Sequence, residues 1–147
     1  MAVRQVDVAL VPLGTEVSYG EYGYEVKGFG SEIALTAEKK LEEHLGEPKQ
    51  FLRGWYVYGD EKKSRVDVHY EDSGVRIHAR IDASDPLPMI KLLCQISFKL
   101  CCRIFVVESK QIFEPSVVDL LNSVSNSRAA AFLANPNLFL KNLARES

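Results

Sequence analysis

The chain has 147 residues, of which 46% are hydrophobic and 26% charged, and its formal net charge at neutral pH is −2. This length suits one domain with its own core, and the composition is typical of a soluble globular protein rather than a membrane-spanning one. Residues 1–50 carry 5 Lys/Arg against 9 Asp/Glu, and no basic stripe follows them, which argues against binding to nucleic acid.

The N-terminal segment lacks the pattern of a signal peptide. The cysteines are confined to one apolar segment, at Cys94, Cys101 and Cys102. Their odd number and close spacing fit neither a disulfide framework nor a zinc site, and no metal or cofactor is expected. Because Cys94 and Cys101 are seven residues apart, they are expected to share one helix face as small buried side chains. A reducing, cytoplasmic setting follows.

The first half of the chain alternates between strand and helix signals. Residues 3–13 are rich in valine and begin with an apolar–polar alternation, which predicts a strand. Residues 14–31, rich in Gly, Tyr and Glu, form a loop or hairpin excursion. Residues 31–48 have helical periodicity and end with Gly46 and Pro48, a typical helix stop. Residues 55–59 are aromatic and β-branched, which favours a strand.

The clearest pattern is a hairpin built from residues 65–70 and 75–81 around the turn Glu-Asp-Ser-Gly. Apolar and polar residues alternate along both segments, so the hairpin has one apolar and one polar face. A register that pairs Tyr70 with Val75 places Asp67 opposite His78. The same register places His69 opposite Arg76.

The second half predicts a buried helix, a strand and a helical tail. Ser84-Asp85-Pro86 is a helix-start signature, and the apolar segment 87–101 is interrupted only by a narrow polar stripe, so this helix is covered on two sides. Residues 103–108 read as a strand, and 111–115 extend it or pair with it. Residues 116–147 form a C-terminal helical tail that is broken at Asn135-Pro136.

Counted without the strand signal at 55–59, the order is strand, helix, strand, strand, helix, strand and then helices. This is the βαββαβ order of a ferredoxin-like sandwich, an α+β fold with an antiparallel sheet and helices on one face. We therefore expect a single domain over residues 1–147 with extra C-terminal helices. The apolar face of the hairpin is expected to lie under the two main helices.

The excursion is the first candidate site, because residues 19–32 hold four glycines and four aromatic residues. Glycines before a helix are typical of phosphate loops, but the lysine and the spacing of those motifs are missing, and the neighbouring glutamates would repel a phosphate. Plain connecting structure and a recognition loop remain as alternatives. Tyrosines give large contact area at low entropic cost, and glutamates favour a basic protein partner. The candidate partner contacts are Tyr19, Glu21, Tyr22, Tyr24, Glu25 and Phe29.

The polar face of the hairpin is the second candidate site. An Asp–His pair is the base-and-orienter unit of several hydrolases, but no Ser or Cys nucleophile accompanies it and arginines crowd the same face. Opposite charges across strands are ordinary stabilisers, so a solvated, salt-linked face is the simpler interpretation. Alternatively this face binds a small ligand through Asp67, His69, Arg76, His78 and Arg80. A metal held by the two histidines is the weaker alternative.

No nucleophile elbow, metal cluster or dinucleotide fingerprint is present, so a binding module is favoured over a hydrolase-type enzyme. In general build, and in the tail SRAAAFLANPNLFLKNL, the chain resembles small bacterial α+β immunity proteins of toxin/effector systems. The resemblance implies a non-enzymatic protein that neutralises a cognate toxin by capping its surface. It carries over no individual functional residue. A regulatory ferredoxin-like domain with a ligand on its sheet face is the alternative.

Overall fold

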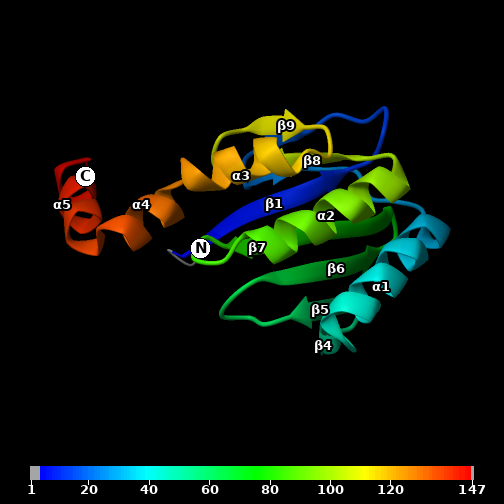
Figure 1. The fold of residues 1–147 in the computed structure, drawn as a ribbon. Coiled ribbons are helices and arrows are strands. Elements are labelled where there is room, and N and C mark those ends of the chain that lie inside the picture. Colours follow the sequence, from blue (N-terminus) through cyan, green and yellow to red (C-terminus); the bar gives the residue numbers. More distant parts are fainter. Residues whose placement is uncertain (1–3, 147) are drawn as a thin grey trace.

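The computed structural model describes residues 4–146, which form a mixed α+β structure around one large sheet (Figure 1). Neighbouring strands of this sheet are antiparallel throughout. In spatial order they are β4 (Lys49–Leu52), β5 (Trp55–Gly59), β6 (Arg65–Glu71), β7 (Gly74–Asp82), β1 (Gln5–Val11), β8 (Arg103–Val106) and β9 (Gln111–Phe113). A separate two-stranded hairpin is formed by β2 (Ser18–Gly20) and β3 (Gly23–Glu25).

The α+β class is confirmed, whereas the ferredoxin-like arrangement is not, because the sheet has seven strands. The strand β4 was not predicted. All four of its residues are exposed at the edge of the sheet, so no apolar–polar alternation marks it in the sequence. The segment after β8 pairs with it as β9, as one of the two alternatives expected.

The described residues form five helices: α1 (Ser31–Leu45), α2 (Leu87–Leu100), α3 (Val117–Ser125), α4 (Arg128–Ala134) and α5 (Pro136–Glu146). The first three lie on one face of the sheet (Figure 1). The helix α1 ends as predicted at Gly46, whose positive φ of 81° suits glycine and whose N–H donates to the Glu42 carbonyl. The last two helices are separated at Asn135-Pro136, also as predicted.

The main core fills the space between the sheet and these three helices. Val8 and Ile77 from the sheet, with Leu41, Leu93 and Leu120 from the helices, are each at most 1% exposed. Fully burying a side chain of this size stabilises the fold by about 1.5–3 kcal/mol relative to leaving it exposed. Alternation along the strands therefore sends the other half of their side chains, including the predicted polar set, to the opposite face.

The register of the β6–β7 hairpin is the one predicted from the sequence. Tyr70 pairs with Val75, Asp67 with His78, and His69 with Arg76. Because side chains alternate with a strict period of two, a shift by one residue would have buried the charged set against the helices. The hairpin is thus fixed with its charged side chains on the open face of the sheet.

The cysteine prediction is wrong for one residue. Cys94 and Cys102 are buried, but Cys101 is exposed and ends α2 in a left-handed conformation with φ of 52°. Cys101 therefore lies outside the periodic part of the helix, and it does not share the buried face of Cys94. All three thiols are free. Among the described residues, no helix is both long and apolar enough to cross a bilayer.

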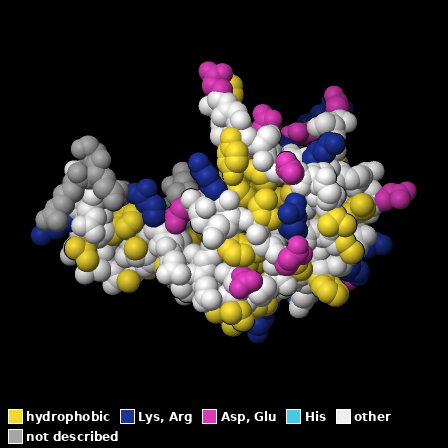
Figure 2. Space-filling model, turned by 90° about the horizontal axis from the view of Figure 1, so that it is seen from above, with side chains coloured by type: hydrophobic (Ala, Val, Ile, Leu, Met, Phe, Trp, Pro, Cys, Tyr) yellow, Lys and Arg dark blue, Asp and Glu magenta, His cyan; other side chains and the backbone are white. Residues whose placement is uncertain are grey.

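The helices α4 and α5 form an arm beside the sheet (Figure 1). They pack on each other, with the rings of Phe132 and Phe139 5.6 Å apart. Seen from above, the arm extends to one side of the body and carries hydrophobic side chains on its surface (Figure 2). Leu138 and Leu140 are both more than half exposed.

Candidate functional site

The predicted excursion contains the hairpin β2–β3, which lies against the open face of the sheet. Its strands pair Ser18 with Glu25 and Tyr19 with Tyr24, and they are joined by the two-residue turn Glu21-Tyr22. The base of the hairpin packs through Tyr24 and Val26 on a small second core around Phe105. Val26 is only 8% exposed. The hairpin is therefore anchored at its base by apolar contacts.

The tip of the hairpin, residues 19–22, is directed to solvent. Tyr22 is 98% exposed and Tyr19 56% exposed, and the side chains of Glu21 and Glu25 are also exposed. Tyr19 lies edge-on to Phe105, with 6.4 Å between the ring centroids. The aromatic and acidic contacts predicted here are thus brought together on one surface, except for two residues.

Those two residues, Phe29 and Tyr24, are not at the tip. Phe29 belongs to the main core at 4% exposure, and its backbone bridges Val75 with N–H···O distances of 2.7 and 2.8 Å. It is therefore not available to a partner at the surface. Tyr24 is half-buried over the sheet, because its position in β3 opposite Tyr19 directs it toward the sheet face. The hairpin therefore contributes to both candidate sites.

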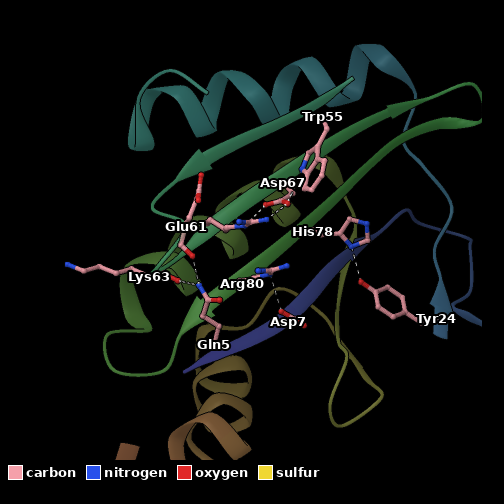
Figure 3. A network of polar contacts seen from close by, with 10 residues as sticks. Gln5, Asp7, Tyr24, Trp55, Glu61, Lys63, Asp67, His78 and Arg80 are labelled. Carbon is pink, nitrogen blue, oxygen red and sulfur yellow. Dashed lines mark hydrogen bonds and ion pairs between the residues drawn. The ribbon is translucent and has the colours of Figure 1, made fainter. Parts of the chain in front are cut away.

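On the polar face, Tyr24 meets His78, with 2.9 Å between Tyr24 Oη and His78 Nδ1 (Figure 3). Asp67 is engaged elsewhere. Arg65 donates to both of its carboxylate oxygens, at 2.9 and 2.8 Å, and the indole N–H of Trp55 donates to Oδ2 at 3.0 Å. Asp67 and His78 are opposite in register but bond other partners, so the base-and-orienter pair of a hydrolase is not formed.

An aromatic row crosses the open face of the sheet. It begins at Phe51 in β4, continues through one ring from each of β5, β6 and β7, and is extended by Tyr24 over β1 to Phe105 in β8. The successive centroid distances are 5.2 Å for Phe51–Trp55, 5.0 Å for Trp55–His69, 5.7 Å for His69–His78, 6.0 Å for His78–Tyr24 and 5.3 Å for Tyr24–Phe105. Rings at these separations attract one another in tilted and stacked arrangements.

The two predicted arginines lie apart. Arg76 pairs with Glu71 at the surface, donating from Nε at 3.0 Å. Arg80 faces Asp7 of β1, with 3.7 Å between Arg80 Nε and Asp7 Oδ1 (Figure 3). This is an ion pair without a hydrogen bond. Asp7 is therefore a member of the site that the sequence did not identify.

A cavity of about 300 Å³ lies between Tyr24 and the sheet. Four strands and the hairpin contribute to its lining, which comprises Asp7, Val8, Tyr24, Trp55, Asp67, His69, His78, Ala79 and Arg80. Four of the five predicted ligand contacts are thus gathered in one place. Arg76 is the exception and does not line this cavity.

Burial determines the protonation states in this cavity. It lowers the pKa of His78 to about 4, with the neighbouring positive charge of Arg76 acting in the same direction. Burial also lowers the pKa of His69 and raises those of Asp7 and Tyr24. Both imidazoles are therefore neutral near pH 7, and Tyr24 keeps its proton. Within residues 4–146, no cluster of His, Cys, Asp and Glu is arranged to hold a metal ion.

Sequence reasoning missed Asp7, Tyr24 and Trp55 as members of the cavity. Asp7 lies within the first predicted strand, where a charged residue marks a polar face whose neighbours only the sheet order reveals. Tyr24 and His78 are 54 residues apart in the chain, and no local pattern links them. No protein-family model matches the chain, and no solved structure matches its fold.

Proposed function

We propose that this protein is a non-enzymatic binding module that recognises a protein partner through the tip of the β2–β3 hairpin. In this proposal it acts in the bacterial cytoplasm as an immunity protein, and it neutralises a cognate toxin by covering part of the toxin surface. The observation that carries the proposal is Tyr22, which is 98% exposed at the end of an anchored hairpin. A large aromatic side chain with no intramolecular burial is typical of a contact residue.

The anchored base supports this function energetically. Val26 and Tyr24 pack on Phe105, so the hairpin is held in place before a partner arrives. A recognition element that is already ordered loses less conformational entropy on binding. The tip therefore combines contact area with a low ordering cost.

Charge supports a basic partner. Glu21 and Glu25 are exposed on the hairpin, and the first fifty residues of the chain carry a net charge of −4 from 5 basic and 9 acidic side chains. Acidic groups around an aromatic contact accelerate association with a basic surface and disfavour acidic partners. A basic toxin or effector domain has the complementary chemistry.

The finer fold assignment is part of the same proposal. The elements β1, α1, β6, β7, α2 and β8 follow one another in βαββαβ order, and their strands are adjacent as β6-β7-β1-β8. We regard them as a ferredoxin-like unit to which β4, β5 and β9 are added at the edges. On this view the hairpin β2–β3 is an insertion between the first strand and the first helix.

The experiment is calorimetric titration with the product of the adjacent gene, using the double variant Tyr22→Ala/Glu25→Ala. We expect its affinity to fall by about tenfold or more, because truncating an interface tyrosine commonly removes over 1 kcal/mol. Its stability should change by less than about 0.5 kcal/mol, since both side chains are exposed.

The matched control is Phe98→Ala. Phe98 is 77% exposed and lies on α2, which covers the face of the sheet opposite the hairpin. This variant should bind like the wild type. Unchanged binding by the hairpin variant would contradict the proposal. Unfolding of the hairpin variant would instead show that the tip is structural.

A further inference from the structure

The cavity under Tyr24 has the dimensions and walls of a small-molecule site. Its volume of about 300 Å³ is at the lower end of ligand pockets, and its walls combine aromatic rings with a few polar groups. The floor is formed by adjacent strands of the sheet, and the ring of Tyr24 forms one wall (Figure 3). Sites on paired strands hold their side chains more rigidly than loops do.

The charges in this cavity are already balanced. Asp67 is neutralised by the two hydrogen bonds of Arg65, and Asp7 faces Arg80 at 3.7 Å. The imidazole rings add no charge near neutral pH. A charged ligand would leave one uncompensated charge in a partly buried place, which is costly. The cavity therefore favours an uncharged ligand.

Hydrogen-bonding capacity remains on the Asp7–Arg80 pair. The distance of 3.7 Å between Arg80 Nε and Asp7 Oδ1 is too long for a hydrogen bond. Neither side chain makes a hydrogen bond with any other described residue. Their side chains are 30% and 40% exposed, and Asp7 Oδ1 is a buried oxygen with no hydrogen-bond partner among the described residues. The carboxylate accepts and the guanidinium donates, so together they match a ligand edge with an N–H beside a carbonyl or ring nitrogen.

The ring of His78 completes the site, because no aromatic ring of the described residues is stacked parallel to it. The ring of His78 is tilted by 79° to His69 and by 60° to Tyr24, so no ring within the described residues stacks parallel to it. Trp55, in contrast, is stacked on both Phe51 and His69. A flat ligand can therefore lie against His78. The second nitrogen of that ring, Nε2, makes no hydrogen bond with the residues the structure describes and is a further polar contact.

We propose that this cavity binds an uncharged planar heterocycle that carries adjacent hydrogen-bond donor and acceptor groups on one edge, which is the chemistry of a nucleobase. Asp7 and Arg80 recognise the edge, and His78 and Tyr24 contact the ring. This site is separate from the hairpin tip and does not depend on the partner-binding function.

The test uses the intrinsic fluorescence of Trp55, because the chain has one Trp and it lies in the cavity wall. The full chain is titrated with adenosine, guanosine, cytidine and uridine, with excitation where these nucleosides do not absorb, and binding is checked by saturation-transfer NMR. We expect saturable binding of at least one nucleoside at submillimolar concentration. The matching 5′-monophosphate should bind no more tightly.

The variant Asp7→Asn keeps the shape of the side chain but places an amide donor where the ligand donates. We expect it to weaken binding by about tenfold, the size expected for a mispaired polar contact. The control Asp85→Asn, exposed in the loop before α2, should bind like the wild type.

Three outcomes would overturn this inference. The first is no saturable binding of any of the four nucleosides by either method. The second is binding that Asp7→Asn leaves unchanged. The third is tenfold tighter binding of the monophosphates or of a single-stranded oligonucleotide, because this would show recognition of charge.

Discussion

His78 is the residue where the polar sheet face and the hairpin excursion meet. Its Nδ1 is 2.9 Å from the hydroxyl of Tyr24, and burial lowers its pKa to about 4 from an ordinary value of 6.5. Between pH 4 and pH 6.5, His78 binds a proton in the unfolded chain but not in the folded chain. The free energy of unfolding therefore falls as the pH falls through this window, and it is fully retained above it.

We expect urea unfolding to show a loss of about 1–2 kcal/mol from His78 between pH 7 and pH 5, since each unit of pKa difference is worth about 1.4 kcal/mol. Burial lowers the pKa of His69 as well, so it adds to the loss. The variant His78→Gln keeps a hydrogen-bonding group for Tyr24 but cannot titrate, and it should lose correspondingly less stability on acidification. His44→Gln, on the exposed surface of α1, should keep the acid dependence of the wild type. An undiminished acid dependence in His78→Gln would contradict the assignment.

Among the elements, the excursion is attached to the sheet at two places in its second half. Tyr24 and Val26 pack on the open face, and the chain then returns beside β7, where Gly28 approaches Gly74. A Cβ on Gly28 would lie 2.7 Å from the backbone carbon of Gly74, which is closer than such atoms come in real proteins. Only glycine fits this crossing without displacement of the backbone.

The variant Gly28→Ala should therefore destabilise the protein by about 1–3 kcal/mol, the usual cost of overpacking. Gly30→Ala is the matched control, because its Cβ would meet nothing within 4 Å and its φ of −64° suits any residue. Its cost should stay below about 1 kcal/mol, the scale of a changed helix cap. Denaturant titration of both variants provides the measurement. Equal stabilities would show that the crossing is loose.

Elements that alternate strictly could be predicted from the sequence, whereas the edge strand β4 could not. The β6–β7 register followed from the period of two, because only one register buries Val66, Val68 and Ile77 together. The strand β4 has no buried face and left no such signal. The alternation of apolar and polar residues indicates which side chains are buried. The strand β4 has no buried side chain and forms only because its backbone pairs with β5.

The candidate site was predictable only in part. Asp67, His69, His78 and Arg80 share a face because of the hairpin register, which the sequence contains. Their neighbours come from β1, β5 and the excursion, and the order of the strands decides which of these meet. The aromatic row from Phe51 to Phe105 is invisible in the sequence for the same reason.

At the scale of the whole molecule, the two faces of the sheet have different roles. Three helices cover one face and form the main core (Figure 1). The other face carries the charged network, the cavity and the anchored hairpin (Figure 3). In our proposal the partner is recognised on the face opposite the main core, so changes at the hairpin tip should leave that core intact.

A growth assay measures whether the hairpin tip of this protein neutralises a toxic partner, as we propose. The product of the adjacent gene is expressed as a toxin together with the wild type, Tyr22→Ala/Glu25→Ala or Phe98→Ala. We predict that the wild type and Phe98→Ala restore growth and that the hairpin variant, present at an equal level, does not. Equal protection by the hairpin variant, or no protection by the wild type, would contradict the claim.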